Sequence, residues 1–132
     1  MPHRLGISET VLVFKQHTEF MGGLDSFLKT VRELKLRAPE QKIMVEAESA
    51  CEALRIARTG VDVLQMDKLE PSQLSSLVQT IRSIDKNVKI SAAGGINEGN
   101  AAAYAETGVD ILVLSSVYFG KPADICAKMV TA

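Results

Sequence analysis

Short apolar runs alternate with longer amphipathic stretches along most of this 132-residue chain. The runs are only a few residues long, are largely apolar and are bounded by turn residues, so they predict strands covered on both faces, as in a parallel sheet. We expect five strands, at Thr10–Phe14, Lys42–Ala47, Val61–Met66 (followed by Asp67), Val88–Ala93 and Ile111–Leu114.

The stretches between these runs carry apolar residues at helical spacing, with an apolar position about every third or fourth residue. Pro39 must end the first helix, since proline cannot continue one. The predicted helices are Leu24–Leu36, Ser49–Arg58, one that opens at Glu70-Pro71-Ser72, Glu98–Glu106 and a short one from Pro122 onward. The resulting order, with strands and helices in alternation, is that of an α/β fold.

One segment of the chain occurs twice. Ala57–Leu64 returns 48 residues later as Ala105–Leu112, with six of the eight positions identical. Each copy ends a helix at a Thr-Gly pair, where a left-handed glycine is expected, and starts a strand through Val-Asp. A period that contains whole strand–helix units indicates a parallel α/β array, in which chemistry occurs at the carboxyl ends of the strands.

Two architectures are compatible with such an array: a doubly wound open sheet and part of a (β/α) barrel. The first strand is followed by Lys15-Gln16-His17 rather than by a glycine fingerprint, which disfavours a dinucleotide-binding fold. A closed eight-stranded barrel needs roughly 200 residues or more. We therefore predict one domain over residues 1–132 that is a partial (β/α) barrel of about five parallel strands.

Composition narrows the function classes. Apolar residues make up 46% and charged residues 23% of the chain, and the net charge of −1 gives no basic field for nucleic acid or an anionic membrane. No apolar run is as long as a membrane span, and Met1–Arg4 does not resemble a signal peptide. Cys51 and Cys126 have no metal or redox spacing, so we expect two reduced thiols in a cytoplasmic protein.

Two carboxylates stand at predicted strand ends. Glu46 ends an otherwise apolar strand, where a carboxylate is costly unless it meets a hydroxyl, a lysine or Mg²⁺. Asp67 is likewise a carboxylate at the end of an apolar strand, the next one along the chain. Both are candidates for chemistry, whereas Asp62 and Asp110 lie at strand starts and are expected to cap or turn the chain.

A glycine loop follows the fourth strand at Ala93-Gly94-Gly95-Ile96-Asn97. Its glycines allow backbone N–H groups to approach an anion, and we expect the next helix to direct its positive end to the same place. In barrels, phosphate commonly binds at the loops after the last strands, here those at Gly94 and at Ser115-Ser116. The alternative is a tight turn without a ligand.

Taken together, these motifs resemble the quinolinate phosphoribosyltransferase family over nearly the whole chain. The matching segments are His3–Ile7, Val45-Glu46, Met66-Asp67, Ala93–Asn97 and Thr107–Asp110. Within the family the chain resembles most the ModD branch, named for molybdenum transport, because of its Ala-Ala-Gly-Gly-Ile-Asn loop and the segment Tyr118–Ile125.

The resemblance implies a phosphoribosyl group transferred from phosphoribosyl pyrophosphate to a ring nitrogen, with a pyridine carboxylate or another ring-nitrogen compound as acceptor. It implies that His3 and Arg4 bind an acceptor carboxylate, and that Glu46 and Asp67 hold ribose hydroxyls and Mg²⁺. The 5′-phosphate would then bind at the Gly94–Gly95 and Ser115 loops.

Three positions depart from the family pattern. The strand lysine that faces the acceptor is Phe14 here, and the adjacent Lys15 should point to the other face of the strand. The phosphate-loop serine is Ala93, and a glycine after the last strand is Ser115. The change at Phe14 favours an acceptor other than quinolinate, or none.

The family also has an N-terminal α+β domain and a first barrel strand ahead of the segment that matches His3, and neither is in this sequence. We therefore expect a truncated chain, with unpaired sheet edges that favour a homo-oligomer. Two alternatives to a transferase remain open. One is a non-catalytic binding or assembly protein associated with molybdate transport. The weaker one is another phosphate-binding barrel such as an aldolase-type enzyme.

Overall fold

The computed structural model describes residues 10–118. His3, Arg4, Cys126 and the helix expected from Pro122 lie outside the described residues. Within the described range, Cys51 is an exposed free thiol. No helix in this part of the chain is both long enough and apolar enough to cross a membrane.

Five parallel strands form one sheet with the spatial order β1-β2-β3-β4-β5, the same as their order in sequence. The strands are β1 (Thr10–Val13), β2 (Lys42–Ala47), β3 (Val63–Asp67), β4 (Lys89–Ala93) and β5 (Ile111–Leu112). A doubly wound sheet reverses its strand order at a switch point, and this sheet has no reversal. The order is that of consecutive strands in a barrel wall, which confirms the predicted α/β partial barrel.

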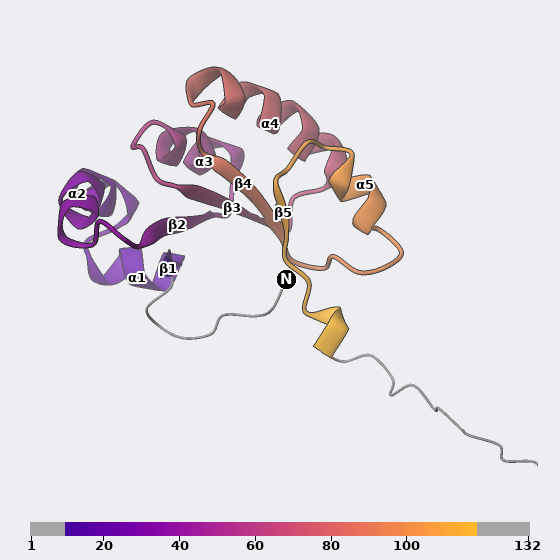
Figure 1. The fold of residues 1–132 in the computed structure, drawn as a ribbon, viewed down its shortest axis with the longest axis horizontal. Helices are drawn as coiled ribbons and strands as arrows, with labels where there is room; N and C mark the ends of the chain where they lie inside the picture. Colours follow the sequence, from indigo (N-terminus) through magenta and orange to yellow (C-terminus); the bar gives the residue numbers. More distant parts are fainter. Residues whose placement is uncertain (1–9, 119–132) are drawn as a thin grey trace, which may run out of the picture.

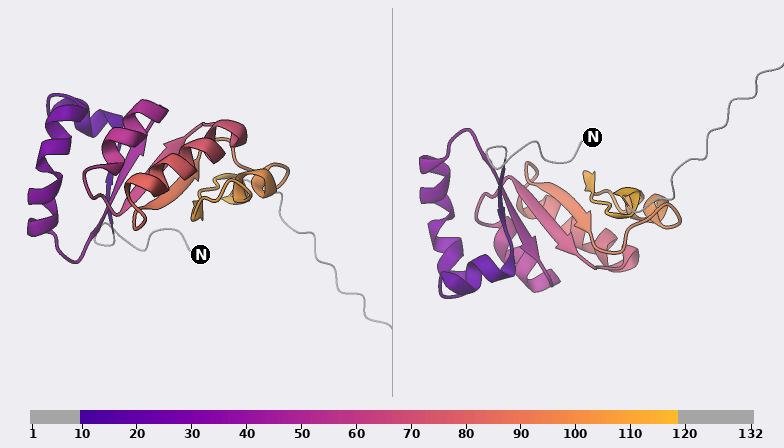
Figure 2. Two further views of the ribbon diagram at one scale, coloured as in Figure 1. Left: turned by 90° about the horizontal axis from the view of Figure 1, so that it is seen from above. Right: turned by 90° about the horizontal axis from the view of Figure 1, so that it is seen from below.

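The helices follow the strands in turn: α1 (Lys15–Phe20), α2 (Leu24–Arg37), α3 (Ala50–Ala57), α4 (Pro71–Ile84), α5 (Ala101–Ala105) and the 3₁₀ helix η1 (Ser116–Tyr118). Figures 1 and 2 show the longer helices α2, α3 and α4, together with α5, along one face of the fanned sheet. The opposite face, which we call the open face, is covered by no helix of the described residues.

Strand register assigns side chains to the two faces. In β2, Ile43, Val45 and Ala47 are fully buried under the helices. The alternate residues Met44 and Glu46 therefore point to the open face, since neighbouring side chains on a strand point in opposite directions. Glu46 pairs in register with Gln65, and Gln65 pairs with Ser91, so all three lie at one level of the open face.

The helix ends follow the sequence signals. Ser49 caps α3 by accepting a hydrogen bond from the Glu52 N–H at 3.3 Å, and Pro71 occupies the first turn of α4. Gly60 and Gly108, the equivalent glycines of the repeat, both have positive φ, at 76° and 85°. The prediction of a left-handed glycine after each helix is therefore confirmed.

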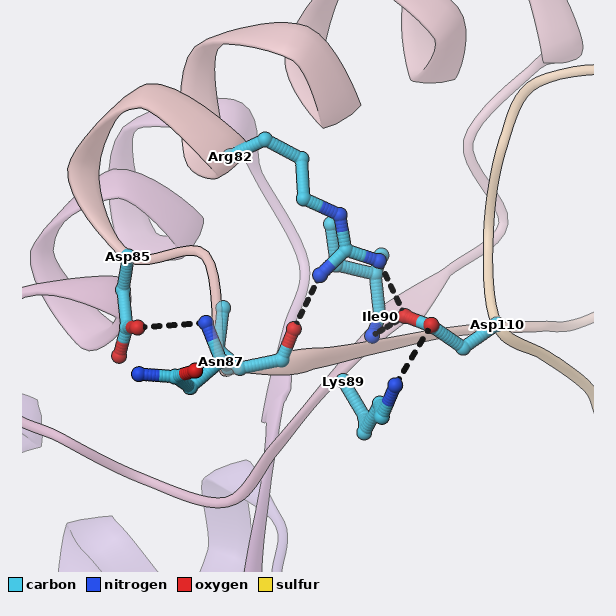
Figure 3. Close-up of polar contacts among 7 residues, drawn as sticks. Arg82, Asp85, Asn87, Lys89, Ile90 and Asp110 are labelled. Atoms are coloured by element: carbon cyan, nitrogen blue, oxygen red, sulfur yellow. Dashed lines mark hydrogen bonds and ion pairs between the residues drawn. The ribbon is translucent and has the colours of Figure 1, made fainter.

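Asp62 and Asp110 bind the amino ends of neighbouring strands. The Asp62 carboxylate accepts from the Ile43 N–H at 2.9 Å and from Lys35 Nζ at 3.0 Å. The Asp110 carboxylate accepts from the Ile90 N–H at 2.8 Å, from Lys89 Nζ at 3.2 Å and from Arg82 (Figure 3). These are structural contacts that fix the strand starts, as the sequence predicted for this edge of the sheet.

Both of these carboxyl groups have a pKa below its ordinary value. Burial raises the pKa of Asp62, but the Ile43 hydrogen bond and Lys35 outweigh it. Burial likewise raises the pKa of Asp110, and the bonds from Ile90, Arg82 and Lys89 overcome it. The ionised forms are therefore favoured by the fold.

Several boundaries differ from those predicted. α1 was not expected, because six residues with mixed polarity give no clear helical period. α5 spans only Ala101–Ala105, since residues 98–100 form a turn in which Gly99 N donates to Asn97 Oδ1. β5 ends at Leu112 rather than Leu114, because within the described residues it pairs with β4 alone.

Candidate functional site

Glu46 is a half-buried carboxylate on the open face. Its Oε2 accepts a hydrogen bond from Gln65 Nε2 at 2.8 Å. Burial raises its pKa, the Gln65 bond lowers it, and the nearby charges of Asp67 and Glu48 raise it further, so that the net shift is upward. Glu46 pairs in register with Gln65 on the neighbouring strand, and Asp67 lies two residues beyond Gln65 on the same face, so the two predicted carboxylates occupy adjacent strand ends.

Asp67 and Lys68 form the carboxyl end of β3. Lys68 has a φ of 57°, the one positive φ among the non-glycine residues that the structure describes. Its N–H donates to the Ala93 carbonyl at 2.9 Å, and its Nζ lies 3.2 Å from Asp67 Oδ2. A lysine in the left-handed region is strained, and such strain is concentrated at functional sites.

Gly94 lies directly against this strand end. A Cβ built on Gly94 would stand 2.6 Å from Lys68 Cγ and 2.7 Å from Asp67 Oδ1, far inside contact distance. Only glycine fits there, both for space and for its φ of 88°. The glycine loop and the Asp67 carboxylate are therefore one packed unit rather than two separate features.

Gly95 differs from its neighbour, because no atom lies within 4 Å of a Cβ built there and the residue is exposed. Its carbonyl accepts from Asn97 Nδ2 at 3.2 Å and from Asn100 Nδ2 at 3.1 Å. Among residues 10–118 the N–H groups of Gly94 and Gly95 donate no hydrogen bond. The loop is thus held from one side and has free donors for an anion.

The expectation that the next helix directs its positive end at this loop is wrong. The turn at residues 98–100 separates the loop from α5, and α5 is a single short turn of helix that begins at Ala101. A helix of five residues has only a small dipole, so any anion held here must rely mainly on the free backbone N–H groups and on hydroxyls.

Ser115 and Ser116 are exposed and lie after β5. A cavity of about 480 Å³ is lined by Asn97, Glu98, Leu114, Ser116 and Val117, so the end of the glycine loop and Ser116 border the same cavity. Ala93, by contrast, is buried and offers no hydroxyl. Of the two predicted phosphate loops, only Asn97 and Ser116 border this cavity, and binding of a phosphate there stays a prediction.

Phe14 and Lys15 stand at the end of β1. Phe14 N donates to His17 Nδ1 at 3.0 Å, and the two rings are stacked with centroids 5.8 Å apart. Lys15 Nζ lies 2.7 Å from Glu48 Oε2, an ion pair that raises the pKa of the lysine. Lys15 borders a cavity of about 50 Å³ with Glu46 and Glu48 but is bound to Glu48, so it is not a free cation for a ligand.

Gln65 was missed from the sequence. The signal that could have found it is an amide two residues before Asp67 in an otherwise apolar strand, and therefore on the same face. Among the described residues, no group of three or more His, Cys, Asp or Glu side chains is arranged to hold a metal ion.

Comparison with known proteins then assigns the family. The model of the quinolinate phosphoribosyl transferase C-terminal domain matches residues 1–126. The chain belongs to the quinolinate phosphoribosyltransferase family. The Gly94 loop and the strand ends at Glu46 and Asp67 thus lie in a phosphoribosyltransferase-like domain.

Curated relatives carry two names, putative pyrophosphorylase ModD and nicotinate-nucleotide pyrophosphorylase. A putative pyrophosphorylase ModD from Pasteurella multocida is 34% identical over 123 residues, covering 93% of this chain and 44% of that protein. Another, from Rhodobacter capsulatus, is 39% identical over 100 residues, covering 76% of this chain and 38% of that protein. The chain therefore spans less than half the length of these curated relatives.

The fold of this family member is also found in solved structures. The nicotinate-nucleotide pyrophosphorylase from Francisella tularensis superposes with a TM-score of 0.74 at 23% identity, covering 87% of this chain and 39% of that one. At that identity the similarity supports the fold alone. The five strands of this chain match part of the fold of that protein.

Proposed function

We propose that this domain binds phosphoribosyl pyrophosphate at the carboxyl ends of its strands and contributes to transfer of the phosphoribosyl group to a ring nitrogen. The observation that carries the proposal is the packing of Gly94 against the Asp67 carboxylate. This packing places a carboxylate, which can bind sugar hydroxyls, beside a loop whose free N–H groups can bind a phosphate. A phosphoribosyl group carries both of these, hydroxyls on its ribose and a phosphate at its 5′ end.

The residues would act as follows. Backbone N–H groups of Gly94 and Gly95, with the hydroxyls of Ser115 and Ser116, bind the 5′-phosphate. Glu46 and Asp67 accept hydrogen bonds from the ribose hydroxyls and stabilise the positive charge that develops at the sugar C1. The bond from C1 to pyrophosphate breaks, the ring nitrogen of the acceptor bonds to C1, and pyrophosphate leaves.

Mg²⁺ is the metal we propose for this site. Glu46 and Asp67 fit such an ion, since magnesium is commonly bound by one or two carboxylates together with substrate phosphates and water. When bound with the donor, it would neutralise charge on the departing pyrophosphate. The carboxylates themselves hold the ribose and do not require a preformed metal cage.

The aromatic ring of Phe14 stands where the resemblance expects a lysine, which favours an acceptor other than quinolinate. We propose an acceptor whose ring packs against Phe14, with His3 and Arg4 available for a carboxylate. We propose that a second copy of the chain contributes the remaining parts of the site, in line with the proposed homo-oligomer.

The test is calorimetric titration of phosphoribosyl pyrophosphate with Mg²⁺ into this chain. Glu46→Gln and Asp67→Asn should each weaken binding about tenfold, a loss of roughly 1.4 kcal/mol, as expected for a charged hydrogen-bonding partner. Glu33→Gln, an exposed carboxylate on α2, is the matched control and should change nothing.

Glu46→Gln is a clean variant for this purpose. The glutamine still accepts from Gln65, and it removes a charge that burial disfavours, so folding at neutral pH is retained. Absence of binding by the wild-type chain would overturn the proposal. Binding without pyrophosphate release in the presence of pyridine carboxylates would favour a non-catalytic binding role.

A further inference from the structure

Gln65 is a buried amide with no part in the proposed chemistry. It lies in the middle of β3, is 7% exposed, and points to the open face between the levels of Val63 and Asp67. Burying a primary amide is costly unless it is hydrogen-bonded. Its one hydrogen bond within the described residues is the donation from Nε2 to Glu46 Oε2 at 2.8 Å.

Gln65 has two neighbours at its own level of the sheet. Glu46 lies across on β2 and Ser91 across on β4, each directly opposite in register. The Ser91 hydroxyl is fully buried and has no hydrogen-bond partner among residues 10–118, although Gln65 pairs with Ser91 in register. The amide is thus turned to the carboxylate at the expense of the hydroxyl.

The hydrogen bond from Gln65 makes the two oxygens of the Glu46 carboxylate inequivalent. Oε2 is occupied by Gln65, while Oε1 accepts no hydrogen bond from any residue of the described range. A carboxylate held by one oxygen cannot rotate freely, and its second oxygen keeps a fixed direction. A side chain locked in this way is preorganised for a ligand.

We propose that Gln65 is a positioning residue that fixes Glu46 through Oε2, so that Oε1 is aimed at a ribose hydroxyl. This inference rests on the proposed function in assigning the ribose to Glu46. Gln65 itself does not touch the sugar. Removing its amide should therefore weaken recognition of the sugar hydroxyls while leaving recognition of the phosphate unchanged.

The experiment measures binding of two ligands to the full chain: ribose 5-phosphate, and 2,3-dideoxyribose 5-phosphate, which keeps the ring and phosphate but lacks both hydroxyls. Gln65→Met keeps the side-chain volume and removes the amide. It should weaken ribose 5-phosphate about tenfold and the dideoxy compound less than about twofold. Ser91→Ala, the matched control at the same level, should alter neither affinity.

A purely structural role for Gln65 predicts a different result, namely equal weakening of both ligands, and that result would overturn the inference. So would an unchanged affinity for ribose 5-phosphate in Gln65→Met. If the variant folds poorly, the exchanged pair Glu46→Gln with Gln65→Glu restores the hydrogen bond with its charge moved. Its expected result is normal thermal stability with the preference for ribose lost.

Failure of the proposed function gives a separate signature. A wild-type chain that binds neither phosphoribosyl pyrophosphate nor ribose 5-phosphate overturns that function, and the role of Gln65 with it. A wild-type chain that binds phosphoribosyl pyrophosphate but does not distinguish ribose from dideoxyribose overturns the inference about Gln65 alone.

Discussion

The two copies of the repeat have the same amino-terminal construction and different carboxyl ends. In both, a left-handed glycine ends a helix and an aspartate binds the N–H of a neighbouring strand, at Gly60 and Asp62 and again at Gly108 and Asp110. Beyond that point they diverge. β3 is five residues long and almost wholly buried, whereas β5 has two half-buried residues.

The difference follows from neighbours rather than from local sequence. β3 has strands on both sides and helices over one face, while β5 pairs with β4 alone within the described residues. The half of the unit that is the same in both copies fixes the helix end and the strand start. The half that differs carries the candidate site residues, Asp67 at the end of β3 and Ser115 after β5. The comparison suggests that similar segments acquire different roles from their positions in the sheet.

The largest expected effect comes from truncating the equivalent leucines of the two copies. Leu64 is fully buried, so Leu64→Ala should lower the free energy of unfolding by about 3 kcal/mol. Leu112 is half-buried, and Leu112→Ala should cost about 1 kcal/mol. Urea denaturation measures both. Equal losses would show that β5 is packed as tightly as β3 and would contradict the proposed origin of the difference.

A smaller effect is expected for the aspartates, whose roles are equivalent. Asp62→Asn and Asp110→Asn should each cost about 1–2 kcal/mol at pH 7, with Asp110 the larger because Arg82 and Lys89 both lose a charged partner.

The pH dependence of these two variants has a definite sign. Because the folded pKa of each aspartate is depressed, its stabilisation is complete above the unfolded pKa of about 3.9 and is lost as the pH falls through the folded pKa. Thermal denaturation from pH 7 to pH 3 should show the wild type converging on the variants. A constant difference across that range would contradict the assignment.

The smallest expected effect is at Lys68, where the copies diverge. Lys68→Gly relieves the positive φ and should raise the free energy of unfolding by about 0.5 kcal/mol, because the relief exceeds the entropy cost of glycine. Ser116→Gly, at the equivalent position in η1, is the control and should lower it by about 0.5 kcal/mol. A loss of stability in Lys68→Gly would mean that the lysine side chain contributes more than its strain costs.

The candidate site could be predicted in outline from single residues. Glu46 and Asp67 were found because carboxylates at the ends of apolar strands are unusual, and the structure brings them together. Gly94 was singled out correctly, but the reason given, close approach of an anion, was incomplete. Asp67 and Lys68 leave no room for a side chain at this position whether or not an anion binds. Gln65 was missed because its partner is 19 residues away and only the register of β2 and β3 brings the two together.

The sequence by itself determined the strands, the longer helices, the left-handed glycines and the family, because these depend on local spacing, turn chemistry and short motifs. Only the tertiary structure decided that the strands keep their sequence order with one face open, that Lys15 is bound to Glu48, and that α5 is too short to serve the glycine loop. These depend on register and on contacts between residues far apart in the chain, which no local pattern encodes.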